Sequence, residues 1–99
     1  MMPDAEQFKL YKTENIHIFL KLNTATGQID LLQWSLEEGK EFTVALNRED
    51  LSLFGHAGTF ELYPTQNMFQ FILLDKLLGR TWHVQWGIEE EKRWIKRIY

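Results

Sequence analysis

The chain repeats itself once, with an offset of 52 residues and no gap. Residues 8–40 read FKLYKTENIHIFLKLNTATGQIDLLQWSLEEGK, and residues 60–92 read FELYPTQNMFQFILLDKLLGRTWHVQWGIEEEK. Thirteen of the 33 paired positions are identical, where ordinary residue usage would give about 2 by chance. The identical pairs are Phe8/Phe60, Leu10/Leu62, Tyr11/Tyr63, Thr13/Thr65, Asn15/Asn67, Phe19/Phe71, Leu22/Leu74, Gly27/Gly79, Gln33/Gln85, Trp34/Trp86, Glu37/Glu89, Glu38/Glu90 and Lys40/Lys92. Such a duplication constrains the fold strongly, because both copies must build the same unit.

The size of the chain requires the two copies to share one core. A chain of 99 residues suffices for a single domain and cannot bury two separate cores. We therefore expect one domain over residues 1–99, with repeat 1 at about 8–46, repeat 2 at about 60–98 and a connection at 47–59. Hydrophobic residues make up 44% of the chain and aromatic residues 14%, which is typical of a globular protein.

Apolar residues recur with a period of two within each repeat, which indicates β-strands. One face of the first such segment holds Ile16, Ile18, Leu20 and Leu22. The turn sequence TATG and the segment QIDLLQW follow, and repeat 2 has MFQFILLD, KLLG and RTWHVQW in their place. Each copy is therefore predicted to hold a hairpin. A short apolar piece, FKLY or FELY, precedes it, and EFTVAL (41–46) or RWIKRIY (93–99) follows it as a fourth strand.

Eight short strands in two copies predict an all-β fold of two pseudo-symmetric four-stranded antiparallel meanders. Each meander must cover an apolar face, so we expect one sandwich-like barrel with an approximate two-fold axis. The alternative is a pair of propeller-like blades that oligomerisation completes. Residues 88–99 could form a helix instead of a strand, although their β-branched and aromatic residues favour the strand. One helical turn could also follow Asn47.

Asn15 and Asn67 stand at equivalent positions in the links KTEN and PTQN, ahead of each hairpin. Asparagine tolerates left-handed backbone, and its side chain can bond its own main chain. Both properties suit a turn, so we expect one at each asparagine.

The run from Leu62 to Trp86 has the pattern LYPTxNMxxFxLLDxxxGRxWxVQW. In this pattern, and in its duplication over both halves, the chain resembles small uncharacterised bacterial proteins. The resemblance implies a bacterial origin and a compact β module. It implies no activity, because none is known for those proteins.

The two copies differ most on one face of the hairpin. In repeat 1 that face reads His17, Phe19, Lys21, Asp30, Leu32 and Trp34, and in repeat 2 it reads Phe69, Phe71, Leu73, Trp82, Val84 and Trp86. The hairpin of repeat 2 is thus apolar on both faces, and such strands are usually covered on both. The connection 47–59, with Leu51, Leu53 and Phe54, is one candidate cover; another copy of the protein and a bound ligand or partner are the others.

The residues that carry chemistry give little support to an enzyme. The absence of cysteine excludes disulfides, thiolate metal sites and a cysteine nucleophile. His17, His56 and His83 do not align in the repeat and have no metal-ligand spacing. We therefore predict a non-enzymatic protein without a cofactor or metal.

Aromatic residues remain as the candidate contacts. Trp34 and Trp86 are kept in both copies, which favours a core position for each. The predicted contact residues are Trp82, Trp94, Phe69 and Phe71. They favour an interaction module that acts through protein–protein contacts, including self-association. A carbohydrate- or nucleotide-binding domain that uses exposed tryptophans is the alternative.

Charge and hydropathy limit the remaining partners. A net charge of −3 argues against DNA binding. No apolar run reaches about 18 residues, so we expect no membrane span. The N-terminal sequence MMPDAEQFKLYK has no signal-peptide apolar region, which favours the cytoplasm. The sequence leaves the identity of a small-molecule ligand open.

Overall fold

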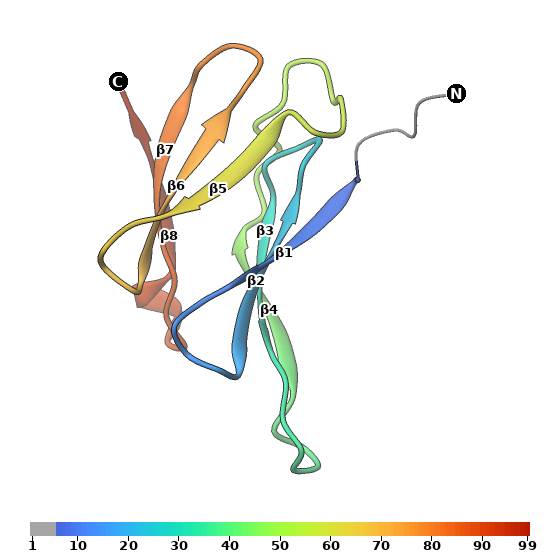
Figure 1. Cartoon of the computed structure of the whole chain (residues 1–99), viewed down its shortest axis with the longest axis vertical. Helices are drawn as coiled ribbons and strands as arrows, with labels where there is room; N and C mark the ends of the chain where they lie inside the picture. Colours follow the sequence, from blue (N-terminus) through green and yellow to red (C-terminus); the bar gives the residue numbers. More distant parts are fainter. Residues whose placement is uncertain (1–5) are drawn as a thin grey trace.

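The computed structural model describes residues 6–99, which form eight strands in two antiparallel sheets (Figure 1). Sheet 1 consists of β1 (Phe8–Lys12), β2 (Ile18–Asn23), β3 (Ile29–Gln33) and β4 (Phe42–Asn47). Sheet 2 consists of β5 (Phe60–Pro64), β6 (Gln70–Asp75), β7 (Thr81–Gln85) and β8 (Trp94–Ile98). In each sheet the strands lie side by side in chain order. The predicted all-β class and the two four-stranded meanders are confirmed.

The structure tests two local predictions, one for the segment 93–99 and one for the residues that follow Asn47. The strand predicted over 93–99 is confirmed as β8, where Ile95 packs against the core. The helical alternative is wrong, since the segment before β8 holds only a single 3₁₀ turn, η1 (Glu90–Lys92). The helical turn expected after Asn47 is also wrong. The Asn47 side chain is buried and donates to the carbonyl oxygens of Gly27 (2.9 Å) and Glu49 (3.1 Å), which fixes the start of the connection without a helix.

The turns before the two hairpins are built alike. Asn15 Oδ1 accepts the backbone N–H of His17 at 2.9 Å, and Asn67 Oδ1 accepts that of Phe69 at 2.9 Å. The expected bond from asparagine to its own main chain is therefore confirmed. The left-handed backbone is not used, because within residues 6–99 only glycines have positive φ.

The two sheets pack through opposite faces of the repeat. β2 buries its first, third and fifth residues, Ile18, Leu20 and Leu22. β6 buries its second, fourth and sixth residues, Phe71, Leu73 and Asp75. A two-fold axis would bury equivalent positions in both copies, so the expected two-fold arrangement is wrong.

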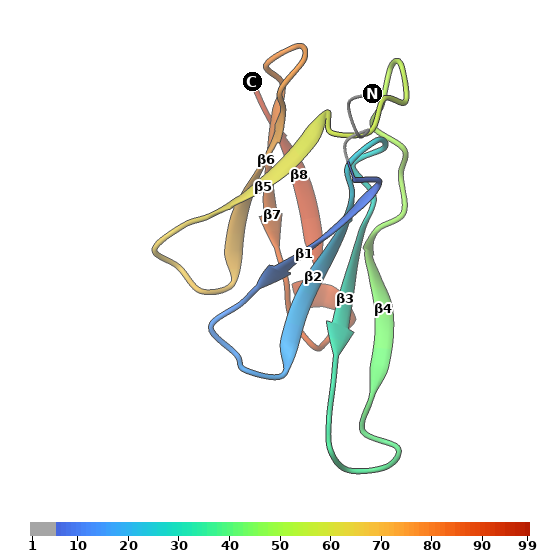
Figure 2. The same cartoon turned by 45° about the vertical axis from the view of Figure 1, so that its right-hand side comes forward.

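The copies are instead stacked head to tail. Figures 1 and 2 show β1 and β5 running in the same direction, and likewise β2 and β6. The face that sheet 1 turns inward is therefore the face that sheet 2 turns outward. No strand of sheet 1 pairs with a strand of sheet 2 in the described chain, so the sheets form a sandwich without hydrogen-bonded closure.

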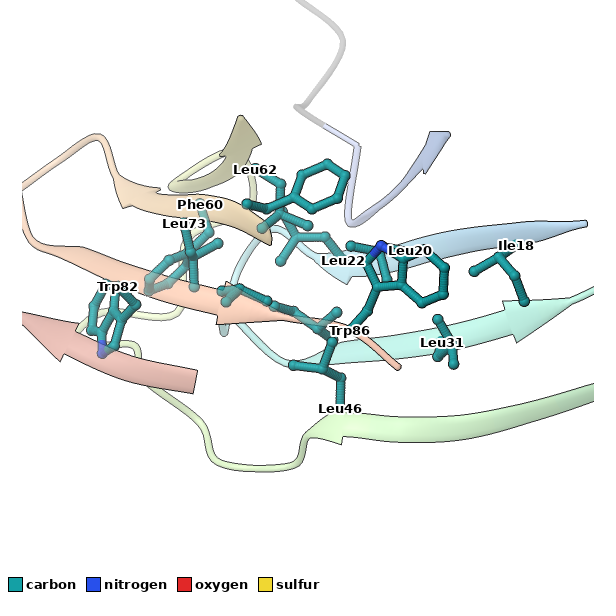
Figure 3. Packing of buried hydrophobic residues seen from close by; sticks show 13 residues of the cluster. Ile18, Leu20, Leu22, Leu31, Leu46, Phe60, Leu62, Leu73, Trp82 and Trp86 are labelled. Atoms are coloured by element: carbon teal, nitrogen blue, oxygen red, sulfur yellow. The ribbon is translucent and has the colours of Figure 1, made fainter. Parts of the chain in front are cut away.

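One hydrophobic core fills the space between the inner faces of the two sheets (Figure 3). Its buried members are Ile18, Leu20, Leu22, Ile29, Leu31, Leu46, Phe60, Leu62, Phe71, Leu73, Trp82, Val84 and Trp86. Both sheets contribute, as expected for a chain of this size that has a single core.

Two equivalent glycines close the hairpin loops, and only one of them is crowded. Gly27 has φ of 81° and Gly79 has φ of 74°. A Cβ on Gly27 would lie 3.1 Å from Leu51 Cδ1 and 3.3 Å from Phe60 Cδ1, whereas a Cβ on Gly79 would meet nothing within 4 Å. The two positions therefore separate backbone strain from crowding.

We expect Gly79→Ala to lower the free energy of unfolding by about 1–2 kcal/mol, the cost of left-handed backbone at a residue with a Cβ. Gly27→Ala should cost at least about 1 kcal/mol more, because the new methyl group presses on Leu51 and Phe60. Urea unfolding of both variants measures the difference. Equal losses would show that the Gly27 loop yields without strain.

Candidate functional site

Two of the four predicted contact residues lie in the core. Phe71 is 3% exposed and Trp82 is 6% exposed, so neither can meet a partner at the surface of this fold. The reason is the head-to-tail stacking, which turns the aromatic face of repeat 2 toward the core shared by the two sheets. Trp82 has no tryptophan counterpart because its equivalent, Asp30, lies on a face that repeat 1 leaves open.

The sequence predicts three candidate covers for that aromatic face: the connection 47–59, another copy, and a bound ligand or partner. None of them is the main cover. In the connection, only Leu51 packs against the core, and its N–H donates to the Thr26 carbonyl at 2.7 Å. Leu53 and Phe54 are 64% and 61% exposed. Sheet 1 does the covering, and neither a second copy nor a ligand is needed for it.

Buried Trp82 has two cations near its ring. The guanidinium carbons of Arg80 and Arg97 lie 5.0 and 5.2 Å from the ring centroid. Phe60 packs on the same ring at 5.9 Å between centroids. Arginine over an aromatic face is attracted by the ring quadrupole, so these contacts stabilise Trp82 where it is.

Phe69 remains partly accessible, next to a tryptophan that is not. Its ring lies 4.9 Å from that of Trp86, which is 2% exposed, while Phe69 is 42% exposed. The Trp86 indole N–H donates to the Met68 carbonyl at 2.9 Å. These residues and Ile88 line an open hollow of about 410 Å³ at one end of sheet 2.

Repeat 1 has the same arrangement of a tryptophan, a ring packed on it and a carbonyl bonded to its indole N–H, but no sheet lies over it in the described chain. The Trp34 indole N–H donates to the Ile16 carbonyl at 2.8 Å, and the ring lies 4.9 Å from His17. Trp34 is only half-buried, however, on the side of sheet 1 away from sheet 2. The expectation that both repeated tryptophans are core residues thus holds for Trp86 alone.

Trp94, the fourth predicted contact residue, lies on the outer face of sheet 2. It meets His83 edge to face at 4.9 Å, and Lys96 Nζ lies 5.1 Å from its ring centroid. We define the sheet 2 outer face by the half-buried residues Ile72, Leu74, His83 and Trp94. It corresponds by the repeat to the inner face of sheet 1.

The outer face of sheet 1 is the surface that sequence reasoning missed. We define the sheet 1 outer face by Phe8, Leu10, Phe19, Leu32 and Trp34. Phe8 and Leu10 are 54% and 55% exposed, whereas their counterparts Phe60 and Leu62 are 1% and 2% exposed. The available signal was that four of its five residues are identical between the copies.

A charge pair interrupts this face. Lys21 Nζ lies 3.9 Å from Asp30 Oδ2, at the positions that Leu73 and Trp82 occupy in repeat 2. Beside the pair and Phe8 is an open hollow of about 300 Å³. The face is therefore apolar at its margins and polar at its centre.

A polar cluster ties the first strands of the two copies together. Lys9 Nζ lies 2.9 Å from Glu61 Oε1, and Tyr63 donates its hydroxyl proton to Glu61 Oε2 at 2.7 Å. Hydrogen bonds from Tyr63 and Lys9 hold the pKa of Glu61 below its ordinary value. The hydroxyl oxygen of Tyr11 accepts the backbone N–H of Leu62 at 3.2 Å.

The histidines are scattered. His17 packs on Trp34, His83 packs on Trp94, and His56 lies in the connection with its ring 6.2 Å from that of Phe54. Within residues 6–99 there is no group of three or more histidine and acidic side chains that could hold a metal ion.

Comparison with known proteins adds no function to this geometry. The chain matches no family model, no curated protein and no solved structure. In the described part of the chain, no helix has the length and apolar character needed to cross a membrane.

Proposed function

We propose that the protein is a non-enzymatic interaction module that acts through protein–protein contacts made by the outer faces of its sheets. One observation carries this proposal: the sheet 1 outer face repeats, in exposed or half-buried positions, the apolar residues that repeat 2 buries in the core. Phe8 and Leu10 are more than half exposed. Apolar side chains that gather at exposed positions of one face mark interaction sites in soluble proteins.

The sheet 2 outer face supports the same function. Trp94 lies on this face, and tryptophan is one of the residue types that dominate the energetics of protein interfaces. Ile72 and Leu74 lie on the same face, as half-buried side chains with no third layer over them in residues 6–99. Both sides of the sandwich therefore present apolar residues for contact.

A carbohydrate- or nucleotide-binding role has less support. It needs a flat aromatic ring that is free to stack, and of the two tryptophans proposed for it Trp82 is buried. Trp94 already has the Lys96 ammonium near its ring, and the His83 ring meets it edge to face at 4.9 Å between centroids. The protein-contact proposal uses both outer faces, whereas this alternative would rest on Trp94 alone.

The proposal is tested by site-specific photo-crosslinking in living cells. A benzophenone-bearing phenylalanine analogue replaces Leu10 on the sheet 1 outer face, and in the control it replaces Leu36. Leu36 is 94% exposed and lies in the β3–β4 connection, away from both faces. We expect discrete protein adducts from position 10 and none from position 36. Equal adducts from the two positions, or none from position 10, would contradict the proposal.

A further inference from the structure

The interface between the two sheets is heterologous, and the molecule carries both of its halves again on its outside. Inside the chain, the inner face of sheet 1 packs on the inner face of sheet 2. By the 52-residue repeat, the sheet 2 outer face is equivalent to the inner face of sheet 1. The sheet 1 outer face is likewise equivalent to the inner face of sheet 2.

Resting on the proposed function, we infer that the contact partner is a second copy of this chain. The sheet 1 outer face of one copy docks on the sheet 2 outer face of the next, and the contact repeats the internal interface. Such a head-to-tail contact leaves one free face at each end of every pair. Further copies therefore add until a ring closes, or a filament grows.

The sheet 1 outer face, which we call the docking half, is better preserved between the copies than the sheet 2 outer face. Phe8, Leu10, Phe19 and Trp34 are identical to the buried residues Phe60, Leu62, Phe71 and Trp86, and Leu32 stands for Val84. The buried set is at most 3% exposed. The same side chains that fill the internal interface are thus available to fill an external one.

The sheet 2 outer face, which we call the receiving half, keeps the apolar residues at its centre. Ile72 and Leu74 take the places of Leu20 and Leu22, which are fully buried inside the chain. Figure 3 shows Trp86 pointing from sheet 2 toward Leu20 and Leu31 of sheet 1. The equivalent arrangement between copies sets Trp34 of one chain against Ile72 and His83 of the next.

The polar contacts of the internal interface also have complementary counterparts. Inside the chain Lys9 pairs with Glu61 at 2.9 Å. Shifted by one repeat, the same contact joins Lys9 of one copy to Glu61 of the next, again with opposite charges. Tyr63 likewise takes the place of Tyr11, so the Tyr63 hydroxyl of the next copy can accept the N–H of Leu10, as Tyr11 accepts that of Leu62 inside the chain.

Substitutions on both halves make the external contact weaker than the internal one. Lys21 and Asp30 replace Leu73 and Trp82 on the docking half. The receiving half has Gln70, Thr81 and His83 in the places of Ile18, Ile29 and Leu31. Assembly of the chain is therefore reversible and increases with protein concentration, while each copy stays folded by its own core.

Two variants that each block one half give the decisive experiment. Leu10→Glu blocks the docking half, and Ile72→Glu blocks the receiving half. Light scattering on a sizing column, from low micromolar to submillimolar protein, should show a mass that rises with concentration for the wild type. Each variant alone should remain monomeric. An equimolar mixture should form a dimer and nothing larger, because each variant supplies the half that the other lacks.

Three outcomes would overturn the inference: a wild type that is monomeric throughout, variants that still associate as the wild type does, or a mixture that stays monomeric. Circular dichroism establishes that each variant is folded, and Phe8→Glu with His83→Glu forms a second pair if one is not. The outcome also separates this inference from the proposed function. A monomeric wild type whose position 10 crosslinks to a different protein leaves the interaction module standing and removes only self-assembly.

Discussion

Trp86→Ala lowers the free energy of unfolding by about 3–5 kcal/mol, the range for truncating a large aromatic side chain in a core. Trp86 is 2% exposed in the space between the two sheets, and its indole N–H bonds the Met68 carbonyl. Removing it empties the side of the core that faces Leu20 and Leu31 (Figure 3). Denaturant unfolding, followed by circular dichroism at low micromolar protein, measures the loss.

Trp34→Ala is the matched control, since the repeat gives Trp34 the same local construction. Its indole N–H makes the equivalent bond to the Ile16 carbonyl. It lies half-buried on the sheet 1 outer face, so we expect a loss of only about 1–2 kcal/mol. Equal losses for the two tryptophans would contradict the head-to-tail packing, because a two-fold arrangement would bury both alike.

Asp75→Asn lowers the free energy of unfolding by about 3 kcal/mol, near the lower end for breaking a buried ion pair. The Asp75 side chain is 1% exposed, and Arg80 Nε donates to its Oδ2 at 2.8 Å. Arg80 also donates to the Leu51 carbonyl at 2.8 Å and so holds the connection on sheet 2. The loss is not larger, because the Arg80 side chain is 23% exposed and keeps some water.

The pH dependence of this loss identifies the charge. Burial raises the pKa of Asp75, but hydrogen bonds from Arg80, Leu78 and Leu77 lower it by more, and the net pKa lies below the ordinary value. A depressed folded pKa contributes stability above the unfolded pKa of about 3.9, and this contribution disappears as the pH falls through the folded pKa. Wild type and Asp75→Asn should therefore differ fully near neutral pH and converge below about pH 4.

Asn23→Ala provides the control for the loop itself. Asn23 occupies the position equivalent to Asp75, and its Oδ1 accepts the Ala25 N–H at 3.0 Å without any ion pair. We expect a loss of about 1 kcal/mol with no change over the acid range. A difference between wild type and Asp75→Asn that stayed constant to low pH would rule out the carboxylate as its source.

Local patterns in the sequence were sufficient for the strands and the turns. Alternation in NIHIFLKLN and MFQFILLD predicted β2 and β6, and the match of RWIKRIY to EFTVAL predicted β8. The asparagine turns were also predictable, because an asparagine side chain bonds main chain only two residues away. These features depend on interactions within a few residues, which a repeat displays twice.

The candidate faces were only partly predictable. Of the four predicted contact residues, Phe69 is exposed and Trp94 is half-buried, while Phe71 and Trp82 are buried. The apolar residues particular to repeat 2 pointed to its inner face, which the chain itself covers. The outer face of repeat 1 was missed, because Phe8 and Leu10 look like core residues when their counterparts Phe60 and Leu62 are buried.

The sequence by itself determined that one unit is built twice and that each unit is a four-stranded antiparallel meander. Its period of two assigns side chains to two faces of a strand. It does not say which face is covered when both are apolar, as in the hairpin of repeat 2. That choice was made by the tertiary structure alone, because the free energy of burial depends on where the other sheet lies. Head-to-tail stacking covers one face of each copy and leaves the other two open.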